Sequence, residues 1–98
     1  MLFAIHMIDR AGGAQLRAQT AEQHREFVGK YLDKMYLGGP LLDDNGETPI
    51  GSLIVMDFPN RQLAETFIAS EPYNKAGLFE RVTITCFGPV VEPTPASP

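Results

Sequence analysis

Histidine is the side chain best suited to moving protons near neutral pH, and this chain contains two. An imidazole has an ordinary pKa of about 6.5, so it can both accept and donate a proton there. His24 lies in the segment EQHREFVGKY, three residues before Phe27 and four before Val28. On a helix, this spacing turns His24 toward the same side as these apolar residues. Such a histidine either hydrogen-bonds a backbone carbonyl in the core or lines a cleft between helix and sheet, where it could act on a ligand.

Two other segments have residue types that favour ligand binding. A Gly-Gly-Pro sequence follows the helical region, and Gly39 with Pro40 would let a ligand approach the backbone closely. The segment Glu71-Pro72-Tyr73 places a carboxylate and a phenol outside regular structure, where functional residues tend to collect. These groups are candidates for a site together with the histidine.

Four further residues have structural explanations that compete with chemical ones. Ser52 could hydrogen-bond a ligand, but a serine that begins a strand is more often a satisfied surface residue. His6 shares the mostly apolar face of a strand, which favours a structural role. Asp9 ends that strand and is expected to serve the turn that follows. Cys86 lies in the middle of a strand and is expected to be inert core.

Length and composition exclude several classes of function. The chain of 98 residues has room for one domain, and its net charge of −4 comes with eight thinly spread Lys and Arg residues. Without a basic cluster, a nucleic-acid partner is not expected. No apolar run reaches the roughly 18 residues that span a bilayer, and the single cysteine suits a reducing cytoplasm. No metal-ligand spacing, phosphate-binding glycine loop or nucleotide fingerprint occurs, so we expect no metal and no cofactor.

Periodicity and turn residues predict the elements that must position these groups. We expect strands at residues 2–9, 37–43, 51–58 and 81–90 and helices at residues 14–35 and 61–70. Residues 73–79 are expected to form an irregular segment or a single helical turn. The domain then covers residues 1–90, and the proline-rich tail of residues 91–98 is expected to be disordered.

The order of these elements, β-α-β-β-α-β, predicts an α+β fold of the ferredoxin-like type, a four-stranded antiparallel sheet with both helices on one face. Such a fold leaves the other face of the sheet bare. The first strand nevertheless has apolar side chains on both faces, with Ala4 and Ile8 opposite Ile5 and Met7. A second copy of the chain packing sheet to sheet would cover the bare face, so we expect a homodimer.

The ordered set of motifs resembles the YCII-related family, small proteins of the YciI type. The family pattern has a helical histidine, Gly-Pro in the second strand, Gly-Ser opening the third, an acid-Pro-Tyr segment after the second helix, and then a Gly-Leu/Val-Phe/Tyr segment. In this chain the matching residues are His24, Gly39-Pro40, Gly51-Ser52, Glu71-Pro72-Tyr73 and Gly77-Leu78-Phe79. The resemblance covers roughly residues 1–90. The family usually has aspartate where this chain has Glu71, which is longer by one methylene.

This resemblance implies a dimeric α/β barrel of ferredoxin-like units and a cleft that holds a His–carboxylate pair. It assigns His24 and Glu71 as the catalytic pair of a cofactor-free lyase or isomerase, similar to dehydrohalogenases or muconolactone isomerases. A carboxylate beside the imidazole would orient the ring and fix its tautomer. The residues that would contact a small organic substrate are Gly39, Pro40, Ser52, Pro72 and Tyr73. The alternative is a non-catalytic dimeric module that binds a small molecule or serves a regulator, an alternative that the longer Glu71 favours.

Overall fold

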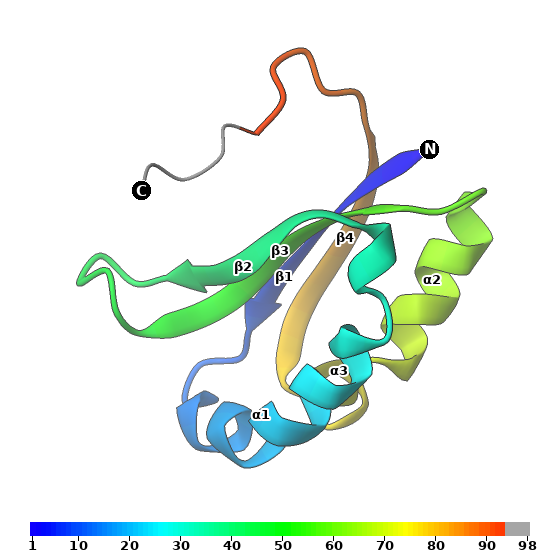
Figure 1. Cartoon of the computed structure of the whole chain (residues 1–98). Coiled ribbons are helices and arrows are strands. Elements are labelled where there is room, and N and C mark those ends of the chain that lie inside the picture. Colours follow the sequence, from blue (N-terminus) through cyan, green and yellow to red (C-terminus); the bar gives the residue numbers. More distant parts are fainter. Residues whose placement is uncertain (94–98) are drawn as a thin grey trace.

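A sheet covered on one side by helices makes up the structure, a computed structural model in which residues 1–93 are described. The elements are β1 (Leu2–Asp9), α1 (Ala14–Gly29), the 3-10 turn η1 (Leu32–Lys34), β2 (Met35–Leu42), β3 (Pro49–Asp57), α2 (Arg61–Ser70), α3 (Pro72–Lys75) and β4 (Phe79–Phe87). The strands pair antiparallel in the order β2-β3-β1-β4 (Figure 1). The predicted ferredoxin-like α+β topology is therefore confirmed.

The helix α2 occupies the predicted residues because both of its ends carry strong local signals. Asn60 is extended, with φ −156° and ψ 167°, and its side-chain oxygen accepts a hydrogen bond from the Leu63 backbone N–H at 3.0 Å. This N-cap satisfies an amide that has no partner within the helix. At the other end Glu71 is extended, with φ −68° and ψ 128°, because Pro72 follows it. The same Glu71 then caps α3.

The first helix is shorter than predicted, since helical spacing had suggested that it continues to Met35. It ends at Gly29, and Met35 instead begins β2, where it pairs with Met56 of β3. Glycine is a poor helix residue, and the ring of Tyr31 packs on Phe67 with centroids 4.8 Å apart as the chain leaves the helix. The prediction for residues 30–35 was wrong because an apolar residue at helical spacing can equally be a strand residue.

The strand boundaries also differ from the prediction by a few residues. β2 and β3 begin at residues 35 and 49 instead of 37 and 51, and β4 covers residues 79–87 instead of 81–90. β4 ends at Phe87 because its neighbour β1 begins at Leu2, which pairs with Phe87. Within residues 1–93, the chain beyond Phe87 has no neighbouring strand with which to form ladder hydrogen bonds.

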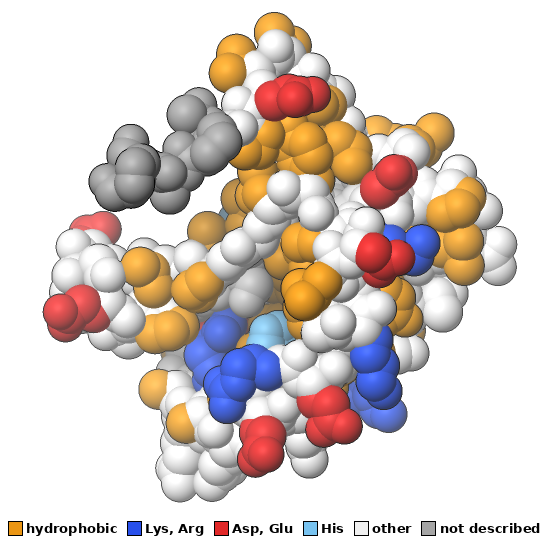
Figure 2. All heavy atoms as spheres, viewed as in Figure 1, with side chains coloured by type: hydrophobic (Ala, Val, Ile, Leu, Met, Phe, Trp, Pro, Cys, Tyr) orange, Lys and Arg blue, Asp and Glu red, His pale blue; other side chains and the backbone are white. Residues whose placement is uncertain are grey.

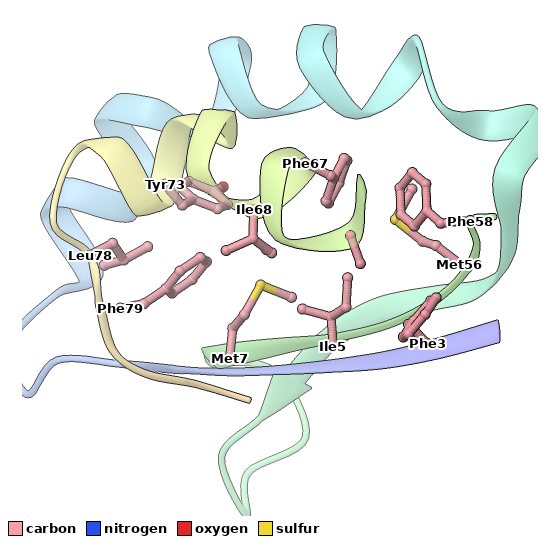
Figure 3. Close-up of a cluster of buried hydrophobic side chains, with 11 residues drawn as sticks. Phe3, Ile5, Met7, Met56, Phe58, Phe67, Ile68, Tyr73, Leu78 and Phe79 are labelled. Carbon is pink, nitrogen blue, oxygen red and sulfur yellow. The ribbon is translucent and has the colours of Figure 1, made fainter. Parts of the chain in front are cut away.

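The hydrophobic core lies between the sheet and the helices (Figure 3). β1 contributes to it by alternation, because Phe3, Ile5 and Met7 face the helices and are at most 2% exposed. Phe67 of α2 packs against Phe27 of α1, with ring centroids 5.3 Å apart, and so joins the two long helices. Full burial of side chains of this size stabilises a fold by about 1.5–3 kcal/mol each. This core holds α1 and the end of α2 in place beside the sheet.

The opposite face of the sheet carries apolar side chains with no helix over them. On β1, Ala4, His6 and Ile8 point to this face and are half-buried. Toward the edges of the sheet, Leu37 of β2 and Phe87 of β4 are 38% and 41% exposed. The predicted two-sided apolar character of β1 is therefore seen, and the homodimer that we infer from it stays a prediction.

Near the C-terminus, the expectation that Cys86 belongs to the core is wrong, and the expectation of a disordered tail falls largely on residues outside the described range. The thiol of Cys86 is exposed rather than core, because Cys86 lies near the end of the edge strand β4, with the Met1 sulfur 3.9 Å away. The tail predicted to be disordered includes residues 94–98, which lie outside the described residues. No helix within residues 1–93 is long and apolar enough to cross a membrane.

Candidate functional site

His24 and Glu71 form a hydrogen-bonded pair at the centre of the candidate site. Nδ1 of His24, on α1, lies 2.6 Å from Oε1 of Glu71, which joins α2 to α3. The second oxygen of Glu71 accepts a hydrogen bond from the Asn74 backbone N–H at 3.3 Å. The Glu71 side chain is 2% exposed and the His24 side chain 27%. A buried carboxylate thus orients a ring that still reaches solvent. When Nδ1 carries the proton and donates to Glu71, Nε2 keeps a free lone pair.

Tyr73 packs against the imidazole and helps to hold it. The rings of Tyr73 and His24 stack, with centroids 4.2 Å apart and 19° between their planes. The guanidinium carbon of Arg17 also lies over the Tyr73 ring, 4.6 Å from its centroid, in a cation–π contact. Burial raises the pKa of Tyr73, although the positive charge of Arg17 opposes the rise. The phenol therefore stays protonated at neutral pH and can donate a hydrogen bond.

Arg17 is a residue of the site that the sequence analysis missed. Its Nε and Nη2 atoms donate to the two carboxylate oxygens of Asp9 at 2.8 and 2.9 Å, a bidentate ion pair. Nη2 also donates to the Gly51 carbonyl at 3.1 Å and to Ser52 Oγ at 3.3 Å. Burial lowers the pKa of Arg17, but the hydrogen bond and charge of Asp9, together with the nearby Tyr73, outweigh burial and raise that pKa. Asp9, which we expected to serve a turn, instead fixes a charged guanidinium between α1, β1 and β3.

A cleft of about 600 Å³ lies between α1 and the β2–β3 hairpin, and the residues that line it include Arg17, His24, Ser52, Glu71 and Tyr73. α1 presents three small side chains to the cleft, Ala14, Ala18 and Ala21, so the helix does not fill the space. Figure 2 shows the hollow with a histidine side chain inside it, between cationic and hydrophobic side chains. Binding sites for small organic molecules usually have volumes of about 300–1,000 Å³, so this cleft can hold one.

The predicted substrate-binding residues do not all reach the cleft. Gly39, Pro40, Ser52 and Tyr73 line it, whereas Pro72 is not part of the lining and instead begins α3. Ser52 is 7% exposed, so the expectation that it is a surface residue is wrong. It lies on the side of β3 that faces the helices, where a guanidinium contacts its hydroxyl.

The sequence of α1 contains a signal that could have found Arg17. Arg17, Ala21, His24 and Val28 recur at intervals of four, three and four residues, and all of them line the cleft. Such intervals mark one face of a helix. The neighbouring face of α1 packs on the core through Phe27. The sequence pattern was read forward from His24 to Phe27 and Val28, and not back from His24 to Ala21 and Arg17.

Chemically, these groups are arranged for proton transfer. Nε2 of His24 can take a proton from a ligand in the cleft, and Glu71 would stabilise the resulting imidazolium. Tyr73 and Arg17 supply hydrogen-bond donors for a ligand oxygen. In the part of the chain that the structure describes, no group of three His, Cys, Asp or Glu side chains converges as metal ligands would.

The chain resembles known proteins in both its sequence and its structure. The family model of the YCII-related domain matches residues 1–88. The 5-chloro-2-hydroxyhydroquinone dehydrochlorinase of Burkholderia phenoliruptrix AC1100, in complex with 2,5-dihydroxybenzoquinone, is 27% identical over 90% of this chain and 94% of that chain, with a TM-score of 0.84. A crystal structure of an antibiotic biosynthesis monooxygenase is 12% identical over 91% of this chain and 100% of that chain, with a TM-score of 0.53, and shows a shared fold alone. No curated protein sequence matches. The predicted fold of the dimeric α/β barrel type is thus confirmed.

Proposed function

The chain belongs to the family of YCII-related domains, and from this membership we propose that it is a cofactor-free lyase or isomerase acting on a small organic molecule. The observation that carries the proposal is the 2.6 Å contact between Nδ1 of His24 and Oε1 of Glu71 beside an open cleft. Because the carboxylate holds Nδ1, the other ring nitrogen is left to exchange protons with a ligand.

The proposed chemistry is an elimination or an isomerisation that begins with proton abstraction. In an elimination, Nε2 of His24 takes a proton from the substrate, and the electron pair left behind forms a new π bond. A leaving anion such as chloride departs with the electrons of its bond to carbon. In an isomerisation, Nε2 returns the proton to another carbon. No electrons are gained or lost overall in either reaction, so neither needs a redox partner. Glu71 stabilises the imidazolium intermediate through a charge-assisted hydrogen bond.

The similarity to the dehydrochlorinase supports an elimination on a ring substrate. That protein shares 27% of its residues with this chain, is named for the removal of hydrogen chloride, and was solved with a hydroxylated quinone. The cleft here offers apolar side chains such as Val28 and Ile54 beside the polar pair. We therefore propose halogenated hydroquinones as the substrate class. In the keto tautomer of such a ring the halogen lies on an sp³ carbon, so loss of the neighbouring proton and of the halide leaves a quinone.

The test is to measure chloride release from a panel of chlorinated hydroquinones by wild-type protein and by His24→Asn. The asparagine side chain can still hydrogen-bond Glu71 but cannot accept a proton. General acid–base catalysis contributes about 10²–10⁴-fold to rate. The variant should therefore release chloride at least about a hundredfold more slowly, with its melting temperature retained.

The matched control for the carboxylate compares Glu71→Gln with Glu65→Gln. Glu65 is exposed on α2 and outside the cleft, so its substitution removes the same charge without touching the pair. Chloride release should fall in the first variant and not in the second.

A loss of melting temperature in His24→Asn with chloride release unchanged per folded molecule would instead mean a structural histidine. Binding of the panel without turnover by the wild type would favour the non-catalytic binding module.

A further inference from the structure

The cleft carries an excess of positive charge, although the whole chain has a net charge of −4. Arg17 and Arg25 line it, and Glu71 is the acidic residue of its described lining. Both oxygens of Glu71 already accept hydrogen bonds, from the His24 ring and from the α3 backbone. Arg25 is exposed and forms no ion pair with another residue in the range 1–93. A ligand that enters the cleft therefore meets two guanidinium groups. The carboxylate among the described lining residues, that of Glu71, is already occupied by hydrogen bonds.

Arg17 also keeps hydrogen-bond donors that the protein does not use. A guanidinium has five N–H groups in a fixed plane. Those on Nε and Nη2 are directed at Asp9, Gly51 and Ser52. Among the described residues, Nη1 has no hydrogen-bond partner. Nη1 is also not a fully buried atom, because the one buried side-chain N or O atom without a partner in residues 1–93 is the Tyr36 hydroxyl oxygen. Because Arg17 lines the cleft, a ligand there can accept a hydrogen bond from its guanidinium. The bidentate contact with Asp9 neutralises part of the charge, but it also holds the fork rigid, which favours binding of an oxyanion.

The Tyr73 hydroxyl is a second donor in the same place. Burial raises the pKa of Tyr73, and the charge of Arg17 opposes the rise, so the phenol keeps its proton at neutral pH. The guanidinium carbon of Arg17 and the ring of His24 lie 4.6 and 4.2 Å from the centroid of the Tyr73 ring. Arg17, Tyr73 and His24 all line the cleft, so a ligand there can reach all three residues.

We infer that Nη1 of Arg17 and the hydroxyl of Tyr73 form an oxyanion corner that selects ligands with an ionised oxygen, such as a phenolate or an enolate. The corner would hold that oxygen while the rest of the ligand lies against Nε2 of His24. Only the orientation toward His24 rests on the proposed function, since selection of an anion requires no turnover. Arg17 is then a specificity and positioning residue. Preorganised donors of this kind also stabilise negative charge that develops on a ligand oxygen during proton abstraction.

The inference is tested by binding of 4-nitrophenol and its methyl ether, 4-nitroanisole. The first reports its own ionisation by absorbance, whereas the second has a similar shape and cannot ionise. Wild-type protein should lower the apparent pKa of bound 4-nitrophenol relative to free 4-nitrophenol. It should also bind 4-nitroanisole at least about tenfold more weakly than 4-nitrophenol, the ratio expected from one charge-assisted hydrogen bond.

Two substitutions of Arg17 and one control make the assignment specific. Arg17→Lys keeps the charge but loses the planar fork, so the preference for the phenolate should shrink. The double variant Arg17→Gln with Asp9→Asn avoids leaving a buried, unpaired carboxylate, and it should bind the two probes equally while remaining folded by circular dichroism. Arg61→Gln, on α2 and outside the cleft, should behave as wild type.

The outcomes separate this inference from the proposed function. Absence of 4-nitrophenol binding, equal binding of both probes by the wild type, or an unchanged preference in the double variant would each overturn the oxyanion corner, whatever the turnover. A preference for the phenolate that depends on Arg17, in a protein that turns over no member of the chlorinated panel, would support the corner and contradict the lyase.

Discussion

Replacing Glu71 by glutamine tests how strongly the carboxylate holds the site together. Glu71 is 2% exposed, and its two oxygens accept hydrogen bonds from Nδ1 of His24 at 2.6 Å and from the Asn74 backbone N–H at 3.3 Å. Glutamine has the same shape but only one acceptor oxygen. If that oxygen serves His24, the amide NH₂ group faces the Asn74 N–H and that hydrogen bond is lost; if it serves Asn74, the ring must move its proton to Nε2 and accept from the amide at Nδ1. The substitution therefore removes the charge from both contacts and either breaks one of them or imposes the other tautomer.

The magnitude follows from these contacts. A hydrogen bond to a charged group contributes about 1.5–3 kcal/mol, and a buried group left without its partner destabilises by a similar amount. We expect Glu71→Gln to lower the free energy of unfolding by about 2 kcal/mol. For a domain of this size that corresponds to a fall in melting temperature of roughly 8–16 °C. Thermal and denaturant unfolding would be measured at one fixed protein concentration, because an oligomer's stability depends on concentration.

Two comparisons show whether the effect comes from the pair. Glu65→Gln makes the same chemical change at an exposed position of α2 and should alter stability by no more than about 0.5 kcal/mol. Nitrogen-15 NMR of the neutral imidazole should show the proton of His24 on Nδ1 in the wild type and mainly on Nε2 in Glu71→Ala, with His6 as the unchanged internal reference. If Glu71→Gln is as stable as Glu65→Gln, and Glu71→Ala keeps the wild-type tautomer, then the carboxylate does not position the ring and the reasoning fails.

Light scattering at micromolar concentration should give about twice the chain mass of 10.8 kDa, because a second copy would cover the bare apolar face of the sheet; a monomer mass would contradict the dimer. Gly51→Ala should lower the free energy of unfolding by about 1–3 kcal/mol, because an added Cβ would collide with a backbone carbonyl of β1. Gly29→Ala, where an added Cβ has open space, should not be destabilising, and equal effects would refute the argument. Cys86 should react with an aromatic disulfide reagent as fast in the native protein as in denaturant, and strong protection would mean that its exposure is lost in solution. Removing residues 92–98 should leave the melting temperature unchanged, since the buried cluster lies within residues 3–79; a large drop would show that this segment packs.

The order of elements and the fold could be predicted because their signals are local. Alternation along β1 shows which residues share a face, and the structure places Ile5 in the core and His6 on the opposite face as alternation requires. Asn60 and Pro72 mark the two ends of α2 through their own backbone preferences. The end of α1 was less predictable, since Met35 fits a helical stripe and a strand equally well. Its pairing with Met56 of β3 decided between them.

His24 and Glu71 could be identified as candidates from the sequence, but their contact is a property of the tertiary structure. They are separated by 47 positions along the chain, so no spacing rule gives their distance. The resemblance to a family suggested the pair with aspartate, and only the packing of α1 beside the α2–α3 junction shows that the longer glutamate also reaches the ring. Burial of the carboxylate follows from the same packing, because the residues around it come from separate elements.

The sequence by itself determined which side chains share a face of each helix and strand, because these periodicities depend only on backbone geometry. It therefore contained the stripe that carries Arg17 and His24. Only the tertiary structure decided what that stripe faces. The contacts of Arg17 with Asp9 and Ser52 join α1 to two strands and span 8 and 35 positions of the chain. Burial and hydrogen-bond partners depend on such distant neighbours. A charged residue that looks solvated in the sequence could therefore become a fixed part of the cleft.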